Sequence, residues 1–377
     1  MKKPRIGIVG CGAISGIYLQ NLAQVFTEVE LAGVCDLIPH REDDALTAFG
    51  NFVGPDSDYK PVKYKDMHEM FADQSIDIVL NLTRPYEHYE VSMAAIAAGK
   101  HVYSEKPLGA TLEEGTEIQA AAKAKGLYLG GAPDTFLGAG IQTCRKLIDD
   151  GYIGKPVAAT AFFACRGHES WHPDPEFYYQ FGGGPLMDMG PYYITALVNL
   201  IGPVKTVSGM AKKTFPTRRI TSQPHYGTIV DVDVATHVAS QLEFASGAVA
   251  TMIKSFDIHA HRLPILEVYG TEGTLSVPDP NTFGGPVMLY RPEGKTFMEI
   301  PLTFGYEENS RALGLADMAK AIQTGRKARA GVDLTYHVLE VMTGISKSAE
   351  SGKHIDISTQ PERPAPMATG LLPGVLD

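Results

Sequence analysis

The feature that most constrains this chain is a glycine turn between two short apolar segments near its N-terminus. Residues 6–9 are apolar, Gly10 and Gly12 follow, and a second apolar segment, residues 31–35, ends at the carboxylate of Asp36. This order predicts a strand, a tight turn, a helix and a parallel strand, the layout of a dinucleotide-binding βαβ unit. Unpaired N–H groups at the helix N-terminus would bind the pyrophosphate. The alternative is a plain tight turn in an α/β protein.

The residues around this turn predict which dinucleotide binds. Asp36 suits the two ribose hydroxyls of NAD and would repel the 2′-phosphate of NADP. No cation directly follows Asp36, although Arg41 is near in the sequence, so NAD is expected and NADP is the alternative. Ser15 replaces the third glycine and is small enough for close helix–strand packing. The predicted cofactor contacts of the turn are Gly10, Gly12, Ala13, Ile14, Ser15 and Asp36.

Length, charge and cysteine spacing bound the class of protein. The 377 residues suit two domains, and the 44% hydrophobic and 20% charged residues are typical of a soluble globular chain. A net charge of −10 argues against nucleic acid or a membrane surface as partner. No apolar run approaches the ~20 residues of a membrane span. The cysteines lack C-x-x-C spacing and predict reduced thiols in a cytoplasmic protein: Cys11, Cys35, Cys144 and Cys165.

The first third of the chain alternates apolar strands with helical stretches. Strands are expected at residues 6–9, 31–35, 77–82, 101–104 and 127–130, with helices at 87–98 and 111–125. Gly99 and Gly126 follow the two helices, as expected of helix stops. This pattern predicts an α/β fold with an N-terminal Rossmann domain, a doubly wound parallel sheet.

The rest of the chain predicts a C-terminal α+β domain with a large, mostly antiparallel open sheet. Strands are expected at residues 155–165, 230–244, 248–258 and 265–277, and helices at 307–324 and 334–348. The predicted division is a dinucleotide-binding domain at 1–132, a substrate-binding and oligomerisation domain at 133–360 and an irregular tail at 361–377. The chemistry is expected in the cleft at the carboxyl ends of the parallel strands.

Three further motifs narrow the prediction. Residues 81–88 (Asn-Leu-Thr-Arg-Pro-Tyr-Glu-His) follow one strand, and residues 105–107 (Glu-Lys-Pro) follow the next. Residues 182–192 (Gly-Gly-Gly-Pro-Leu-Met-Asp-Met-Gly-Pro-Tyr) open an apolar helix. In order and spacing over nearly the whole chain, these motifs and the N-terminal turn resemble the Gfo/Idh/MocA family, the glucose–fructose oxidoreductase and inositol dehydrogenase group.

The resemblance implies an oxidoreductase that transfers a hydride between NAD(P) and a secondary hydroxyl or keto group of a sugar, sugar derivative or cyclitol. It makes Lys106 the cation beside the reacting oxygen, because a lysine at the carboxyl end of a strand points into the cleft. The alternative for Lys106 is a surface lysine beside a structural glutamate. His88 is either a cofactor-side contact or a residue of a helix's first turn. The predicted contacts on the cofactor side are Thr83, Pro85, His88, Glu105 and Lys106.

Asp188 and Tyr192 lie four residues apart, hence on one face of the helix that they open. Much of the family carries His at the second position as general acid–base, so Tyr192 is a departure. Tyr ordinarily titrates near pH ~10 and His near ~6.5, so Tyr192 would need Lys106 to stabilise its phenolate. Asp188 would orient the substrate or a water. The alternatives are a cleft-lining aromatic for Tyr192 and a helix N-terminal carboxylate for Asp188.

An aromatic and polar segment, residues 166–179, leads into the glycine run and holds the chain's only Trp. Aromatic faces beside hydrogen-bonding groups suit a sugar ring, so we interpret it as a substrate loop; the alternative is a corner of local core. The predicted substrate contacts are Arg166, Trp171, His172, Tyr178, Asp188 and Tyr192. The spacings His168-x3-His172 and His259-x-His261 are ligand-like, but no Cys or acidic cluster completes them, so no metal is predicted.

Two other classes of function use the same motifs. A redox-neutral hydrolase or lyase would oxidise a sugar transiently with tightly held NAD. A non-catalytic sensor could dispense with Lys106 or Asp188, and both are present. The expected partners are a carbohydrate or polyol and a second copy of the chain, because related proteins form homodimers or homotetramers through the C-terminal sheet.

Overall fold

The computed structural model describes residues 3–54, 57 and 59–377, which divide into two compact units. The first unit combines the described part of Met1–Gly138 with Phe304–Tyr336 and Met367–Asp377. The second unit combines Ala139–Thr303 with His337–Pro366. Each unit is therefore assembled from segments that are distant in the sequence.

A parallel sheet forms the centre of the first unit. Within the described residues its strand order is β3-β2-β1-β4-β5-β6, and each pairing is parallel. Apolar side chains such as Ile6, Ile78 and Val102 are fully buried, as expected where helices cover both faces. The predicted doubly wound Rossmann sheet is confirmed. Its strands are β1 (Arg5–Val9), β2 (Glu30–Cys35), β3 (Val62–Lys63), β4 (Ile78–Asn81), β5 (His101–Ser104) and β6 (Leu129–Gly131).

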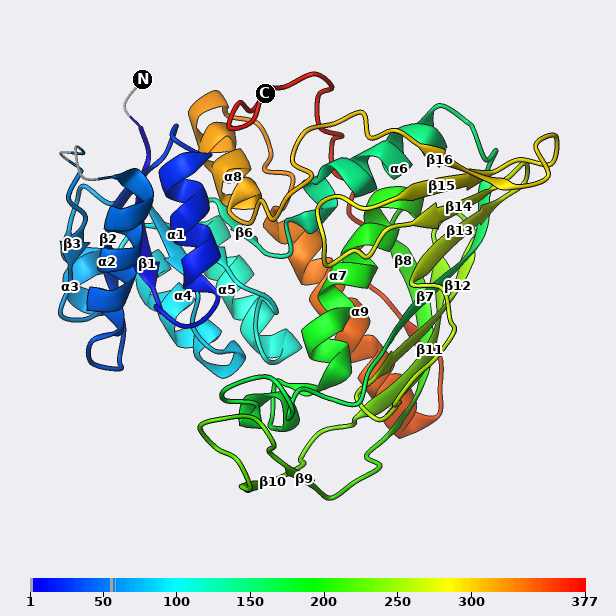
Figure 1. Ribbon diagram of the computed structural model, residues 1–377, viewed down its shortest axis with the longest axis horizontal. Coiled ribbons are helices and arrows are strands. Elements are labelled where there is room, and N and C mark those ends of the chain that lie inside the picture. The colour runs from blue at the N-terminus through cyan, green and yellow to red at the C-terminus, as the bar shows by residue number, and fades with distance from the viewer. Residues whose placement is uncertain (1–2, 55–56, 58) are drawn as a thin grey trace. The chain divides into compact units, whose positions relative to one another are not determined.

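Helices connect these strands and pack around the sheet (Figure 1). They are α1 (Ser15–Gln24), α2 (Arg41–Val53), α3 (Met67–Ala72), α4 (His88–Ala97) and α5 (Leu112–Ala124). The side chain of Thr111 caps α5 by accepting the Glu114 N–H at 3.1 Å. Gly99 and Gly126 follow α4 and α5 with φ of 81° and 65°, so both predicted glycine stops are confirmed.

The prediction of a strand at 127–130 is wrong at its start, because β6 begins at Leu129. The Leu127 N–H donates to the Ala122 carbonyl at 3.0 Å, so residue 127 still belongs to the C-terminal turn of α5. At the other end, the Gly131 N–H donates to the Ala330 carbonyl at 3.0 Å. Residues from the C-terminal part of the chain therefore cover the edge of β6.

The helix predicted at 307–324 begins later, as α8 (Leu313–Thr324). Tyr306 and Ala312 have left-handed φ of 67° and 87°, which a helix cannot contain. The amide of Asn21 on α1 instead donates to the carbonyls of Asn309 and Arg311 at 2.8 and 2.7 Å. The segment before α8 is therefore a loop bound to α1.

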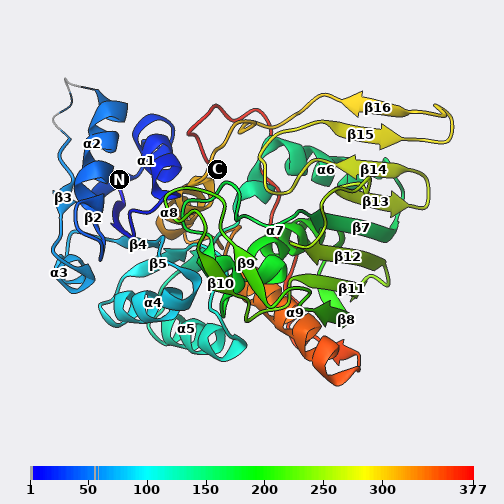
Figure 2. The same ribbon diagram turned by 60° about the horizontal axis from the view of Figure 1, so that its bottom comes forward.

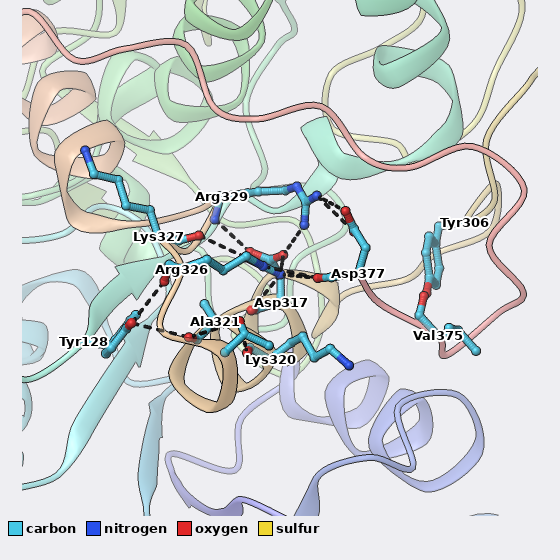
Figure 3. A network of polar contacts seen from close by, with 11 residues as sticks. Tyr128, Tyr306, Asp317, Lys320, Ala321, Arg326, Lys327, Arg329, Val375 and Asp377 are labelled. Carbon is cyan, nitrogen blue, oxygen red and sulfur yellow. Dashed lines mark hydrogen bonds and ion pairs between the residues drawn. The ribbon is translucent and has the colours of Figure 1, made fainter.

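A buried ionic network closes the first unit (Figure 3). The carboxylate of Asp317 on α8 is fully buried and accepts hydrogen bonds from Arg326 Nη2 at 2.6 Å and Arg329 Nη1 at 2.7 Å. Arg329 Nη2 also donates to both carboxylate oxygens of Asp377, at 2.9 and 2.7 Å. A buried charge is tolerated when it is paired in this way. The network fastens residues 367–377 to α8.

A second sheet, of mostly antiparallel strands, forms the second unit (Figure 2). Within the described residues its order is β16-β15-β14-β13-β7-β12-β11-β8-β17, and β7 and β12 are its parallel pair. The predicted antiparallel sheet is confirmed. Its strands are β7 (Pro156–Ala164), β8 (Val204–Lys212), β11 (His237–Phe244), β12 (Val249–Ser255), β13 (Leu266–Gly270), β14 (Thr274–Val277), β15 (Val287–Tyr290), β16 (Phe297–Ile300) and β17 (Ile355–Asp356).

One face of this sheet is covered and the other is not. Along β11 the residues Val238, Leu242 and Phe244 are buried, whereas Gln241 between them is exposed. The helices α6 (Ala139–Asp149) and α7 (Gly184–Ile201) pack against the buried face. The last helix, α9 (Val332–Ser351), extends the helix predicted at 334–348. Across the described stretches, no helix has the length and apolarity to span a membrane.

The prediction of one long strand at 230–244 is wrong. The structure splits it into β10 (Ile229–Asp231), which pairs with β9 (Thr217–Arg219), and β11. Val230 and Val232 bury their side chains in a separate small core with Tyr179 and Phe256. Their apolar alternation serves this small core instead of the second sheet.

Candidate active site

The glycine turn of the first unit has the geometry that a dinucleotide requires. Gly10 has φ of +97°, and a Cβ there would lie 2.8 Å from the carbonyl carbon and oxygen of Leu82. Only glycine fits this position without strain. At Gly12, by contrast, a Cβ would meet no heavy atom within 4 Å. The turn therefore packs tightly against Leu82 at Gly10 and leaves free space at Gly12, where a pyrophosphate would approach.

The carboxylate of Asp36 is held beside this turn by backbone donors. Its oxygens accept the N–H groups of Cys11 at 2.6 Å and Ile38 at 2.7 Å. Ala13 and Ile14 form the turn into α1, and the Ser15 hydroxyl donates to the Gly12 carbonyl at 2.8 Å. The predicted turn residues are thus brought together. This set fits NAD, because the acidic side chain is fixed at the end of β2.

The loop after β4 is organised by Asn81, a residue for which the sequence suggested no role. Its side-chain oxygen accepts from the Thr83 hydroxyl at 2.6 Å, and its amide donates to the His88 carbonyl at 3.2 Å. Pro85 begins a 3-10 helix, η1 (Pro85–Glu87). A buried amide at the end of a parallel strand is the signal that could have identified Asn81.

His88 begins α4 and joins two loops. One ring nitrogen, Nδ1, lies 2.7 Å from the Pro107 carbonyl, and the other, Nε2, lies 3.0 Å from the Thr83 carbonyl. Burial lowers the pKa of His88. The ring is therefore neutral and donates to one carbonyl at a time. Its contacts place His88 between Thr83 and the loop that carries Lys106.

Lys106 follows β5 in a loop fixed on both sides. The Glu105 carboxylate accepts the Tyr18 hydroxyl of α1 at 2.8 Å and the Lys106 N–H at 3.1 Å. The Glu105 N–H donates to the Asn81 carbonyl at 2.8 Å, and the Lys106–Pro107 peptide is cis. The backbone of this half-buried lysine is therefore set by Glu105 and His88.

In the second unit, α7 carries Asp188 and Tyr192. Both are mostly buried, and Asp188 is the fifth residue of the helix, beyond its first turn. The side chain of His168, from the segment after β7, reaches Asp188, with its Nε2 3.4 Å from Oδ2. His168 had been considered only for its spacing to His172, so this contact was missed.

Some side chains of the aromatic segment 166–179 pack against the small core, and others are exposed to solvent. Tyr178 packs against the small core, while the Trp171 side chain is 61% exposed. Arg166 donates from Nε to His259 Nε2 at 3.1 Å. The structure therefore brings His172 and Tyr178 into one ring cluster, with centroids 5.3 Å apart. In the stretches that the structure describes, no group of three or more His, Cys, Asp or Glu side chains could hold a metal ion.

The cysteines are free thiols, as predicted. Cys11, Cys35 and Cys144 are buried, and Cys165 is half-buried. Burial raises the pKa of Cys11 and Cys35 to about 12 and that of Cys165 to about 11. These thiols are therefore protonated and poorly nucleophilic at neutral pH.

Family comparisons match both parts of the chain. Residues 4–131 match the oxidoreductase family with NAD-binding Rossmann fold, and residues 141–276 match the GFO/IDH/MocA C-terminal domain. The chain belongs to the Gfo/Idh/MocA family. The predicted oxidoreductase with an NAD-binding Rossmann domain is thus confirmed for this Gfo/Idh/MocA protein.

Curated relatives extend the similarity to sugar and cyclitol enzymes. The 1,5-anhydro-D-fructose reductase of Ensifer adhaerens is 29% identical over 78% of this chain and 83% of its own. The levoglucosan dehydrogenase of Pseudarthrobacter phenanthrenivorans is 26% identical over 86% of this chain and 88% of its own. The inositol 2-dehydrogenase/D-chiro-inositol 3-dehydrogenase of Lactiplantibacillus plantarum is 31% identical, but over only 41% of this chain and 42% of its own.

Solved structures share the fold over nearly the whole chain. The apo form of a levoglucosan dehydrogenase has a TM-score of 0.81 at 21% identity, covering 96% of this chain and 100% of that one. An aldose-aldose oxidoreductase from Caulobacter crescentus has a TM-score of 0.73 at 23% identity, covering 94% and 100%. At these identities the similarity establishes the architecture of this Gfo/Idh/MocA protein.

Proposed function

We propose that this protein transfers a hydride between NAD and a secondary hydroxyl or keto group of a sugar, sugar derivative or cyclitol. The observation that carries the proposal is the loop of Lys106, which Glu105 and His88 fix at the carboxyl end of β5. A lysine held there suits a developing alkoxide. The named activities of the relatives, a levoglucosan dehydrogenase and a 1,5-anhydro-D-fructose reductase among them, support the substrate class.

Three side chains divide the chemistry in this proposal. Lys106 donates to the reacting oxygen, Tyr192 exchanges the hydroxyl proton, and Asp188 orients the substrate. Bound NAD would accept the hydride from the carbinol carbon at its nicotinamide ring. In oxidation, Tyr192 as phenolate would take the proton from the alcohol, and the positive charge of Lys106 would favour the alkoxide.

The remaining site residues bind and orient. Gly12, Ala13, Ile14 and Ser15 would hold the pyrophosphate, and Asp36 the adenosine ribose, since these residues surround the open turn. On the nicotinamide side the proposed contacts are Thr83, Pro85 and Glu105, and the buried His88 acts behind them by holding the Thr83 carbonyl. The proposed contacts of the substrate ring are Arg166, Trp171, His172 and Tyr178.

The test is absorbance in the NADH band with purified protein, NAD or NADP, and a panel of monosaccharides, anhydrosugars and cyclitols. We expect one class to reduce NAD and Lys106→Ala to abolish the reduction. Lys123→Ala, which alters an exposed lysine on α5, is the matched control. Tight NAD binding with substrate turnover but no net NADH would replace this proposal with a redox-neutral reaction.

We also propose that the protein is a cytoplasmic homodimer or homotetramer. The free thiols support the compartment. The uncovered face of the second sheet supports self-association, because it presents Met210, which is 80% exposed, to solvent. Light scattering after gel filtration would give the mass. A monomer at micromolar concentration would exclude the oligomer.

A further inference from the structure

Within the second unit, one histidine reaches a proposed catalytic carboxylate from a different element. Asp188 lies on α7, and His168 lies in the segment after β7, twenty residues earlier. Their Nε2 and Oδ2 atoms are 3.4 Å apart, and both side chains are mostly buried. Hydrogen bonds in ligand-free sites are often this long and shorten when the substrate binds.

The His168 ring is enclosed by aromatic rings. The centroids of Tyr178, Phe256 and Trp171 lie 4.2, 4.7 and 5.2 Å from its own, all at steep interplanar angles. Only 7% of His168 is exposed. This enclosure fixes the place of the ring by packing, so the contact with Asp188 is not needed to hold it there.

The two ring nitrogens of His168 have different surroundings. Nε2 faces Asp188, whereas Nδ1 is buried and has no hydrogen-bond partner among the described residues. A buried N–H without an acceptor is costly, so the geometry places a ring proton on Nε2, where Asp188 can accept it. With Nδ1 sealed, a proton cannot pass through the ring to solvent. The geometry therefore makes His168 a fixed donor and not a proton relay.

Charged and titratable groups from several elements surround His168. Glu169, the next residue, forms an ion pair with the buried Arg218 at 3.0 Å and also accepts the Tyr179 hydroxyl at 2.5 Å. His172 lies nearby, and burial first and His168 second lower its pKa. Asp188 on α7 is the carboxylate that faces the ring.

We propose that His168 is a positioning residue for the reaction and acts by donating its Nε2–H to the carboxylate of Asp188. The inference rests on the proposed function, because it is through Asp188 that His168 affects turnover. The donor holds Oδ2 in one orientation and favours the charged carboxylate.

Two substitutions separate the donor from the ring. His168→Phe keeps an aromatic ring in the enclosure and removes the donor, whereas His168→Gln offers an amide N–H at a similar reach. We expect kcat to fall by up to roughly a hundredfold in His168→Phe, with the KM for NAD unchanged. The acidic limb of its pH profile should move to higher pH, because the carboxylate has lost a hydrogen bond to its charged form.

His168→Gln should recover most of kcat and the wild-type pH profile. If His168→Phe retains wild-type kcat and the wild-type pH profile, the inference is wrong. Equal losses in both variants, with no shift of the pH profile, would also overturn it, because packing and not the donor would then matter.

A readout without turnover separates this inference from the proposed function. In ¹⁵N-histidine-labelled protein we expect the His168 ring, assigned from the spectrum of His168→Gln, to carry a proton at Nε2 that is hydrogen-bonded to Asp188. Its ¹⁵N signals should shift in Asp188→Asn. Unchanged signals would overturn the inference. If wild type oxidises no substrate of the panel, the proposed function fails even where the contact is confirmed.

Discussion

The two units hold their candidate site residues by different physical means. In the first unit, directional hydrogen bonds through Asn81, His88 and Glu105 connect the loops after β4 and β5. In the second unit, aromatic packing encloses His168, and a long polar contact with Asp188 connects it to α7.

The difference predicts how each unit responds to substitution. Removing a hydrogen-bond partner in the first unit leaves a buried carbonyl or amide unpaired. The site loops then lose their fixed position and the protein loses stability together. In the second unit, the aromatic rings provide the packing and separate polar atoms provide the contacts. A substitution can therefore remove a polar group and leave the packing intact.

The largest expected effect is that of Tyr192→Phe, which removes a hydroxyl from α7 and keeps the ring. We expect kcat to fall roughly 10²- to 10⁴-fold, the usual contribution of general acid–base catalysis. The free energy of unfolding in urea should change by only about 1 kcal/mol. Tyr152→Phe, at an exposed tyrosine, is the control. A loss of stability in parallel with kcat would contradict the proposed difference between the two units.

The next effect is that of His88→Phe in the first unit. It removes the one N–H that the carbonyls of Thr83 and Pro107 share, so we expect the free energy of unfolding to fall by about 1–3 kcal/mol and kcat/KM to fall with it. The measurement is urea denaturation alongside steady-state kinetics. His168→Phe is the matched aromatic replacement in the second unit. A His88→Phe protein with an unchanged urea midpoint would contradict the proposed difference.

A pH-dependent effect concerns Lys254, which is fully buried under α7. Its Nζ lies 2.8 Å from the centroid of the Tyr193 ring and has no hydrogen-bond partner within the described part of the chain. Burial lowers its pKa well below the usual 10.5. Below pH 10.5 the unfolded chain therefore binds a proton that the folded chain does not, so this residue destabilises the fold increasingly as the pH falls.

Lys254→Met removes that penalty. Relative to wild type, it should gain about 1.4 kcal/mol for each pH unit of descent below 10.5, until the folded amine also binds its proton. Urea denaturation at pH 9 and pH 8 measures the difference. A variant with the same pH dependence as wild type would show that the folded protein keeps the amine charged.

The smallest effect is expected for Trp171→Phe. Because this side chain is 61% exposed, the free energy of unfolding should change by less than about 0.5 kcal/mol. If Trp171 stacks on the substrate ring, the KM for the sugar rises while the KM for NAD does not. An unchanged KM for the sugar would remove Trp171 from the proposed substrate contacts.

The sequence predicted the first sheet well because its signals are local. The tight turn at Gly10 and the helix stop at Gly99 follow from single residues with positive φ, and Asp36 is marked by its place at the end of an apolar strand. The segment 230–244 shows the limit. Its apolar alternation was real, but Val230 and Val232 pack in the small core with Tyr179, a partner that no local pattern specifies.

Candidate site residues could be predicted where a characteristic residue type stands at a characteristic place in a motif. Lys106 and Asp188 follow from motifs, whereas the contact of His168 with Asp188 joins residues of separate elements. Asn81 is the first residue of the 81–88 motif. An amide side chain at the end of a buried strand is a signal that it organises the following loop. The discontinuous composition of the units could not be predicted from the sequence either. A prediction that divides the chain into consecutive domains cannot assign residues 304–336 to the same unit as β1.

The covering of β6 by Ala330 has a consequence for how the protein is made. A nascent chain that has reached residue 138 contains the whole first sheet, but the edge of β6 is bare until the ribosome has added Ala330. At ~5–20 residues per second, that interval lasts roughly ten to forty seconds. The first unit is thus interrupted along the chain by the second, and its sheet edge is covered only after Ala139–Thr303 has been made.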